Sequence, residues 1–152
     1  MKLIRTILLA VVSIFLIFTL GARLFGVQYY VVKTSSMYPS IPKYSLVYIK
    51  QLTSEDVLET IEVGDVVAMD VGAELPLMHR ITLIDGNTIT TKGDHNDDLD
   101  SPVASSQIMG IMIFSIPIVG LLFDSVYPWI ILSLLFVLYY GIKYVIKELK
   151  KQ

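Results

Sequence analysis

The sequence predicts a mainly β domain that is carried between two transmembrane α-helices. Hydrophobic residues make up 54% of the 152-residue chain, above the roughly 45–50% of ordinary soluble domains. Two long apolar stretches lie near the ends, at 7–22 and 126–142. Between them, short runs rich in valine, isoleucine and tyrosine alternate with turn residues, as β-strands do. We therefore expect an anchor at 1–27, a β domain at 28–124, and a second span with a basic tail at 125–152.

The first apolar stretch, 7–22, is predicted to be an uncleaved membrane anchor. It is slightly shorter than the roughly 20 residues that span a bilayer, but the apolar residues 24–27 extend it. A cleaved secretory signal peptide is the alternative, because signal peptides share the basic start and apolar middle. Arg23 follows Gly21 and Ala22 and makes a poor cleavage site, which favours the anchor.

The middle of the chain contains several candidate strands and one candidate helix. The strands are expected at 28–33, 45–50, 63–69, 78–84, 88–91 and 107–116, where β-branched and aromatic residues gather. Asp85-Gly86-Asn87 separates two of these strands and is a strong hairpin signal. The helix is expected at 53–60, with Thr53 or Ser54 as its N-cap and acidic residues in its first turn.

The second apolar stretch, 126–142, has no polar face before Lys143 and is predicted to cross the membrane. Trp129 near one end and Tyr140 near the other fit the aromatic belts of a spanning helix. The segment 26–124 holds five basic and thirteen acidic residues, whereas the two ends together hold seven basic and one acidic. By the positive-inside bias, the protein is expected to be a multi-pass protein of the cell membrane. Both termini would be cytoplasmic and the β domain extracytoplasmic. The acidic middle argues against nucleic acid as a partner.

Candidate chemistry centres on serine, histidine and aspartate. Cysteine is absent, which excludes disulfides, a thiolate nucleophile and a cysteine-based metal site. Ser36, in the run Ser36-Met37-Tyr38-Pro39, is a candidate nucleophile, although this composition is also ordinary for a turn. His79 lies in an apolar predicted strand and His95 in a polar turn. Either histidine could be a general base or a residue without a chemical role.

An acidic loop follows, with aspartates at 94, 97, 98 and 100. Oxygen-bearing residues at 94, 96, 98 and 100 resemble the alternate ligands of a calcium loop. The central glycine and the distal glutamate of such loops are missing, and no histidine spacing typical of zinc sites occurs. The sequence therefore predicts no metal and no cofactor, with calcium as a minor alternative.

Taken together and in order, these segments resemble type I signal peptidases, specifically the archaeal and endoplasmic-reticulum-type branch. The run 36–39 is similar to the family's Ser-Met-x-Pro nucleophile box, and 63–67 to its Gly-Asp-Val strand. His79-Arg80 resembles the base box, in which the bacterial branch has lysine and this branch histidine. The run 91–96 is similar to the Lys-Gly-Asp-x-Asn box, with Asp100 six residues after its aspartate. The run 110–117 resembles the segment that closes the domain.

The resemblance implies a signal-peptidase-like β-fold catalytic domain and a role for each site residue. Ser36 would be the nucleophile and His79 the general base. Asp100 is favoured as the acid that orients His79, with Asp94 as the alternative orienting or structural acid. Thr34 would be an auxiliary donor to the oxyanion.

Two departures from the family pattern concern the backbone around Ser36. Ser35 stands where the family usually has glycine, and Tyr44-Ser45 replaces a frequent Gly-Asp. Glycine tolerates φ values that serine avoids, so the conformation at Ser35 is the first point for the structure to answer.

The function implied by the resemblance is a membrane-bound serine endopeptidase that removes N-terminal signal peptides from exported preproteins. Its partners would be such preproteins, the lipid bilayer and, as a further candidate, the secretion translocon. An apolar groove beside Ser36 would bind an extended peptide as an added strand. Two alternatives are an inert β-module displayed on a membrane for adhesion or complex assembly, and a dedicated processing peptidase with few substrates.

Overall fold

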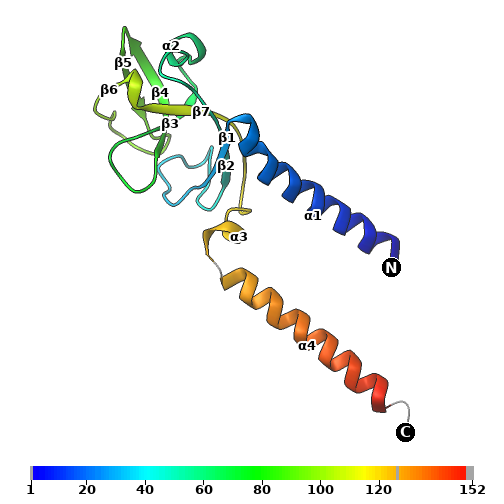
Figure 1. Ribbon diagram of the computed structural model, residues 1–152. Coiled ribbons are helices and arrows are strands. Elements are labelled where there is room, and N and C mark those ends of the chain that lie inside the picture. Colours follow the sequence, from blue (N-terminus) through cyan, green and yellow to red (C-terminus); the bar gives the residue numbers. More distant parts are fainter. Residues whose placement is uncertain (1, 126, 150–152) are drawn as a thin grey trace.

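The structure is a computed structural model that describes residues 2–125 and 127–149. A β domain lies in the middle of the chain, and a long helix leads away from it at each end (Figure 1). These helices are α1 (Lys2–Ala22) and α4 (Tyr127–Leu149), and both extend away from the β domain in the same general direction. Residues 126 and 150–152 of the predicted second span and its basic tail lie outside the described residues.

The β domain is a curled antiparallel sheet, which agrees with the predicted mainly β fold. Its strands are β1 (Val27–Val31), β2 (Leu46–Gln51), β3 (Val66–Met69), β4 (Leu77–Asp85), β5 (Thr88–Lys92), β6 (Val103–Ala104) and β7 (Ile108–Ile116). Their order across the sheet is β1-β2-β7-β3-β4-β5-β6, with antiparallel pairing throughout. The last strand, β7, therefore inserts between β2 and β3 and joins the earlier strands into one sheet.

The predicted strands are found, and two predicted boundaries differ from the structure by three residues or more. The strand expected at 63–69 begins only at Val66, because the residues before it form a turn in which Gly64 has a φ of +103°. The helix expected at 53–60 is confined to α2 (Val57–Thr60). The Thr53 hydroxyl bonds to the Asp56 carboxylate at 2.5 Å, which closes a turn in place of the first helical residues. Four elements were too short to predict from periodicity: η1 (Arg23–Phe25), β6, η2 (Ser105–Gln107) and α3 (Leu121–Asp124).

The core lies on both faces of β3, whose side chains are all buried. Successive residues of a strand point to opposite faces, so Val66 and Ala68 belong to one cluster, and Val67 and Met69 to another. The first cluster also contains Val32, Met37, Ile41, Val47 and Ile49, and the second contains Val57, Ile61, Ile81, Ile89 and Ile108. The first therefore fixes the loop that follows β1, and the second fixes β4 and β5.

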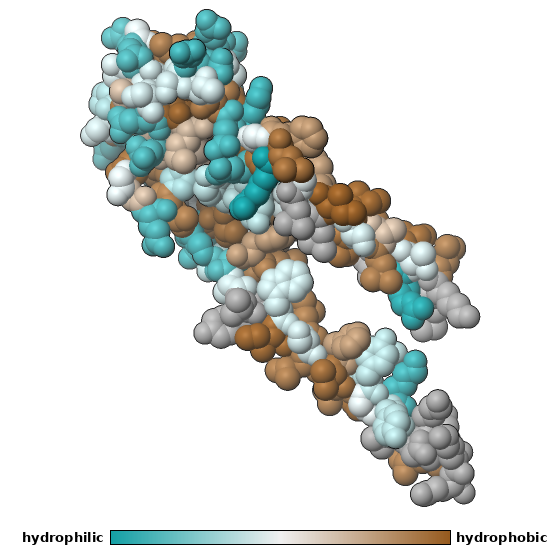
Figure 2. Space-filling model, viewed as in Figure 1, coloured by the Kyte–Doolittle hydropathy of each residue, from teal (hydrophilic) through white to brown (hydrophobic). Residues whose placement is uncertain are grey.

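The last turns of α1 pack against the sheet. Near the end of α1, the Thr19 hydroxyl lies 2.7 Å from the Tyr48 hydroxyl, and the Phe18 ring packs near Tyr48 and Phe114. By length and composition, one stretch within the described residues is able to cross a membrane, Leu3–Phe25; the apolar part of α4, Trp129–Tyr144, is shorter. Figure 2 shows apolar side chains along both helices and polar side chains gathered on the β domain.

Candidate active site

The loop between β1 and β2 carries Ser36 and is anchored by its apolar side chains. Met37 and Ile41 are each only 2% exposed and pack in the first core cluster. The two ends of the loop are joined by backbone hydrogen bonds, from Val32 N to Ser45 O at 3.0 Å and from Tyr44 N to Val32 O at 2.8 Å. Ser36 therefore lies on a segment without regular secondary structure that is nevertheless held firmly against the sheet.

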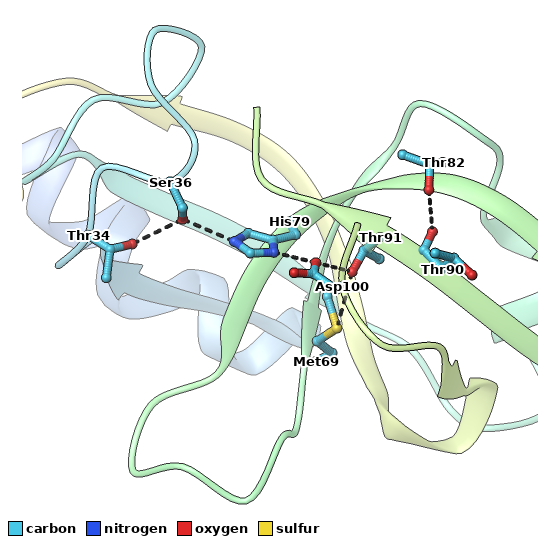
Figure 3. Close-up of polar contacts among 8 residues, drawn as sticks. All are labelled: Thr34, Ser36, Met69, His79, Thr82, Thr90, Thr91 and Asp100. Atoms are coloured by element: carbon cyan, nitrogen blue, oxygen red, sulfur yellow. Dashed lines mark hydrogen bonds and ion pairs between the residues drawn. The ribbon is translucent and has the colours of Figure 1, made fainter. Parts of the chain in front are cut away.

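His79 connects Ser36 to Asp100. It lies on β4 opposite Val67 of β3 and is 3% exposed. Its Nε2 atom is 3.0 Å from Ser36 Oγ, and its Nδ1 atom is 2.5 Å from Asp100 Oδ2 (Figure 3). These three residues, here called the triad, come from the β1–β2 loop, from β4 and from the loop after β5, and the sheet brings them together.

The direction of the two hydrogen bonds follows from the donors and acceptors available. A carboxylate only accepts hydrogen bonds, so Asp100 favours a proton on His79 Nδ1. His79 Nε2 is then the acceptor for the Ser36 hydroxyl proton. This order of hydroxyl, imidazole and carboxylate is the arrangement that nucleophilic acyl transfer requires. The other histidine, His95, is exposed, and its ring lies edge-on against Tyr38.

Thr34 lies beside Ser36, two residues before it in the chain. Its Oγ1 atom is 3.2 Å from Ser36 Oγ. Because the Ser36 hydroxyl donates its hydrogen to His79, the Thr34 hydroxyl is the donor in this contact. The residue predicted as an auxiliary oxyanion donor thus has its hydroxyl beside Ser36 Oγ.

Asp94 has a different partner from Asp100. Arg80 Nε and Nη2 donate to the two Asp94 carboxylate oxygens at 2.8 and 2.7 Å, and Arg80 Nη1 donates to Gly64 O at 2.7 Å. The hydrogen bond from Arg80 lowers the pKa of Asp94; burial opposes this shift and the Ser40 hydroxyl adds to it. The same bond raises the pKa of Arg80. Asp100 is therefore hydrogen-bonded to His79, and Asp94 is bonded to Arg80.

Two contacts at the site were not predicted from the sequence. The Thr91 hydroxyl, on β5, donates to Asp100 Oδ2 at 2.7 Å. His95 N donates to Ser36 O at 2.7 Å, which brings the turn at 93–96 against the nucleophile loop. A Cβ on Gly93 would lie 2.7 Å from Ser36 O, so only glycine allows this approach. The run Thr91-Lys92-Gly93-Asp94 was visible in the sequence, but these contacts depend on the sheet register.

The backbone at Ser35 does not adopt a positive φ. Within residues 2–125 and 127–149, the non-glycine residues with a positive φ are Tyr44 (+64°) and Ile118 (+69°). Ser35 therefore needs no glycine-like conformation. Tyr44, in contrast, occupies the place of the frequent family glycine and adopts a left-handed φ that costs a non-glycine residue about 1–2 kcal/mol.

An apolar cavity of about 230 Å³ lies beside the β1–β2 loop that carries Ser36. It lies between the end of β1 and the start of β4, and its lining includes Val32, Thr34, Met37, Leu75, Leu77 and Met78. Thr34 and Met37, on either side of Ser36 in the chain, are lining residues, so the cavity lies next to the loop that carries Ser36. Its apolar lining suits aliphatic side chains of a bound chain.

The acidic loop does not gather its oxygens around one point. Asp94 and Asp100, at its two ends, are bound to Arg80 and to His79 respectively. Across the described part of the chain, no group of three or more histidine, aspartate or glutamate side chains is arranged to hold a metal ion. The described residues of the acidic loop are therefore not arranged like the ligands of a calcium site.

Comparison with known families defines the class of this protein. A family model described as signal peptidase, peptidase S26, matches residues 2–100, about two thirds of the chain. The matched part includes α1 and all three triad residues, and it identifies the protein as a serine peptidase, a hydrolase of peptide bonds. The chain belongs to the signal peptidase family, whose substrates are preproteins that carry signal peptides. No curated protein and no solved structure matches the chain.

Proposed function

We propose that this protein is a membrane-bound signal peptidase of the archaeal and endoplasmic-reticulum-type branch that works through Ser36, His79 and Asp100. The observation that carries the proposal is the unbroken hydrogen-bonded line from Ser36 Oγ to His79 Nε2 and from His79 Nδ1 to Asp100 Oδ2. Histidine at the position where the bacterial branch has lysine supports the assignment to this branch.

The reaction starts when Ser36 Oγ attacks the carbonyl carbon of the scissile bond and passes its proton to His79 Nε2. The new C–O bond turns the carbonyl oxygen into an oxyanion, and Asp100 stabilises the imidazolium. His79 then protonates the leaving amine as the C–N bond breaks, which leaves an acyl group on Ser36. A water molecule that gives its proton to His79 Nε2 attacks this ester, and the proton returns to Ser36 Oγ.

The oxyanion needs donors, and the Ser36 N–H and the Thr34 hydroxyl are the candidates. In the free protein, Thr34 Oγ1 is 3.2 Å from Ser36 Oγ. Rotation about one bond would move its hydrogen from this oxygen to the oxyanion that forms on the neighbouring carbon. One such donor contributes about 3 kcal/mol to the transition state.

The apolar cavity is the proposed site for the residues before the cut. Its walls come from two segments, 31–34 and 75–78, and we expect an extended peptide to lie alongside them as an added strand. A volume of about 230 Å³ is too small for several bulky side chains at once. Small or aliphatic side chains are therefore expected beside the scissile bond.

Membrane attachment through both helices is part of the proposal. Figure 1 shows α1 and α4 extending from the β domain to the same side, which supports two spans with both termini cytoplasmic. The Trp129–Tyr144 stretch would measure about 24 Å at 1.5 Å per residue, somewhat less than the roughly 30 Å hydrocarbon core. Lys143 would extend its amine to the cytoplasmic interface.

Preprotein cleavage and serine acylation together test this function. The full chain is expressed in membranes with a model preprotein, and is also treated with an acylating inhibitor. We expect cleavage and labelling by the wild type and neither by Ser36→Ala. Wild-type cleavage rates in Ser36→Ala would contradict the mechanism, whereas a wild type without cleavage and without labelling would favour the inert β-module. Proteomics after depletion distinguishes a peptidase with few substrates, because few precursors would then accumulate.

A further inference from the structure

Thr91 lies behind the triad, on the same face of the sheet as His79. It pairs with Ile81 of β4, and Ile81 is two residues beyond His79. Residues two apart on a strand, and residues directly opposite on paired strands, share a face of the sheet. The register between β4 and β5 thus directs the Thr91 side chain towards the loop that carries Asp100.

Thr91 and His79 bind the same oxygen of Asp100. Thr91 Oγ1 is 2.7 Å from Asp100 Oδ2, and His79 Nδ1 is 2.5 Å from that atom (Figure 3). A second bond, from Asp100 N to Thr91 O at 2.9 Å, joins the backbones of the two residues. Asp100 is therefore connected to β5 through both its backbone and its carboxylate.

The Thr91 hydroxyl has one hydrogen, and geometry decides where it goes. Its possible acceptors are Asp100 Oδ2 at 2.7 Å and Met69 Sδ at 3.8 Å. A carboxylate oxygen is a much stronger acceptor than a thioether sulfur, so the hydrogen is directed to Asp100. Thr91 is 1% exposed, which keeps water from taking the place of this bond.

Asp100 depends on such support, because it lies in a loop without regular secondary structure and its side chain is 22% exposed. The terminal torsion of an aspartate is broad, so an unsupported carboxylate could turn Oδ2 towards solvent. Nδ1 of His79 would then lose its acceptor, and Nε2 would no longer be aimed steadily at Ser36.

We propose that Thr91 is a positioning residue, which holds Asp100 Oδ2 in line with His79 and thereby acts on the reaction at Ser36. This inference rests on the proposed peptidase function. Thr91 does not line the apolar cavity, so it acts on the turnover step and not on substrate binding. The hydroxyl carries the role, and the methyl group only fills space in the interior.

Two substitutions separate the hydroxyl from the methyl group. Thr91→Val keeps the shape and removes the hydroxyl, whereas Thr91→Ser keeps the hydroxyl and removes the methyl. With the full chain in detergent micelles and a preprotein substrate, we expect kcat of Thr91→Val to fall about tenfold at unchanged KM. Thr91→Ser should keep most of the wild-type kcat although its melting temperature falls. The opposite order, an active valine variant and a weakened serine variant, means that Thr91 only packs and overturns the inference.

The Asp100→Ala background gives a stricter test. If Thr91 acts through Asp100, Thr91→Val costs no further activity once the carboxylate is gone. Independent, multiplicative losses in the double variant would contradict the inference. Thr82→Val is the matched control, because the Thr82 hydroxyl bonds to Thr90 O at 3.0 Å on the exposed part of the same hairpin. It should leave kcat unchanged.

The role of Thr91 and the proposed peptidase function can fail independently of each other in these experiments. If Ser36→Ala is inactive and Thr91→Val is as active as the wild type, only the role of Thr91 fails. If Ser36→Ala is fully active, the peptidase mechanism itself fails. Should the valine variant not fold, Thr91→Ser and Thr91→Ala form the substitute pair, since they differ only in the hydroxyl. Equal activity of these two would overturn the inference.

Discussion

Two neighbouring residues of β4, His79 and Arg80, each bind a carboxylate of the same acidic loop, yet the two pairs differ in almost every respect. The His79 and Asp100 side chains are 4% and 22% exposed, and Ser36 lies at the end of this pair. The Arg80 and Asp94 side chains are 36% and 15% exposed, and they form a bidentate ion pair.

The difference follows from the alternation of side chains along a strand, which sends His79 and Arg80 to opposite faces. On one face, the His79 ring lies between the Ser36 hydroxyl and one carboxylate oxygen of Asp100, which is the arrangement that proton transfer from the hydroxyl to the ring needs. On the other, Arg80 remains a permanent cation and connects β4 to Asp94 and to Gly64 O. The Arg80–Asp94 pair anchors the turn at 93–96, whose His95 N binds Ser36 O. In the proposed mechanism, the first pair takes part in the chemistry, and the second supports the loop that carries the same serine.

The largest effect is expected from His79→Ala, which removes the base. We expect kcat to fall by about 10⁴-fold or more, as for the loss of a triad histidine in general. The measurement is the initial rate of preprotein cleavage by the full chain in membranes. Arg80→Gln is the matched neighbour and should stay within about tenfold of the wild type while its melting temperature falls. A His79→Ala variant within tenfold of the wild type would remove His79 from the mechanism.

Thr34→Val tests the side of the site that faces the oxyanion. Loss of the hydroxyl should lower kcat by roughly 10²-fold, the usual effect of one oxyanion donor. Thr34→Ser keeps the donor and should retain activity, so a comparison of kcat between the two variants isolates the hydroxyl. Equal rates in both variants would assign Thr34 to the wall of the cavity alone.

The Arg80–Asp94 pair should appear in the pH dependence of stability. Because the folded pKa of Asp94 lies below its unfolded value of about 3.9, the pair stabilises the fold above that pH. This contribution is lost as the pH falls through the folded pKa. Asp94→Asn should therefore be less stable than the wild type at pH 7, and the gap should narrow below about pH 4. The gap should be no more than about 1 kcal/mol, because Arg80 is partly exposed and water screens the pair. Unfolding in detergent from pH 7 to pH 3 measures it, and a gap independent of pH would contradict this role.

The smallest effect concerns the backbone of the nucleophile loop. Tyr44 has a φ of +64°, so Tyr44→Gly should raise the free energy of unfolding by up to about 1 kcal/mol. Ser35→Gly, at the position where the family usually has glycine, should give no gain, because Ser35 has no positive φ. Chemical denaturation of both variants gives the comparison. A gain at Ser35 and none at Tyr44 would mean that the strain lies elsewhere in the loop.

Sequence patterns were sufficient for the mainly β fold and for the candidate residues, but not for their pairing. Apolar runs and turn residues located the strands because these signals are local. Asp94 and Asp100 lie six residues apart in one loop, and only the fold decides which face of β4 each one meets. The contact of Thr91 with Asp100 likewise depends on the register of Ile81 with Thr91, which is set by long-range pairing. The strain at Tyr44 depends on a φ angle that residue identity alone does not specify.

The central claim is that Asp100, and not Asp94, is the acid that orients His79 for attack by Ser36. The most direct test is kcat for preprotein cleavage by Asp100→Asn and by Asp94→Asn, each as the full chain in membranes. We expect Asp100→Asn to lose about 10³–10⁴-fold, because asparagine can favour the wrong tautomer of His79. Asp94→Asn should remain within about tenfold of the wild type. The reverse order, or equal losses in the two variants, would contradict the account.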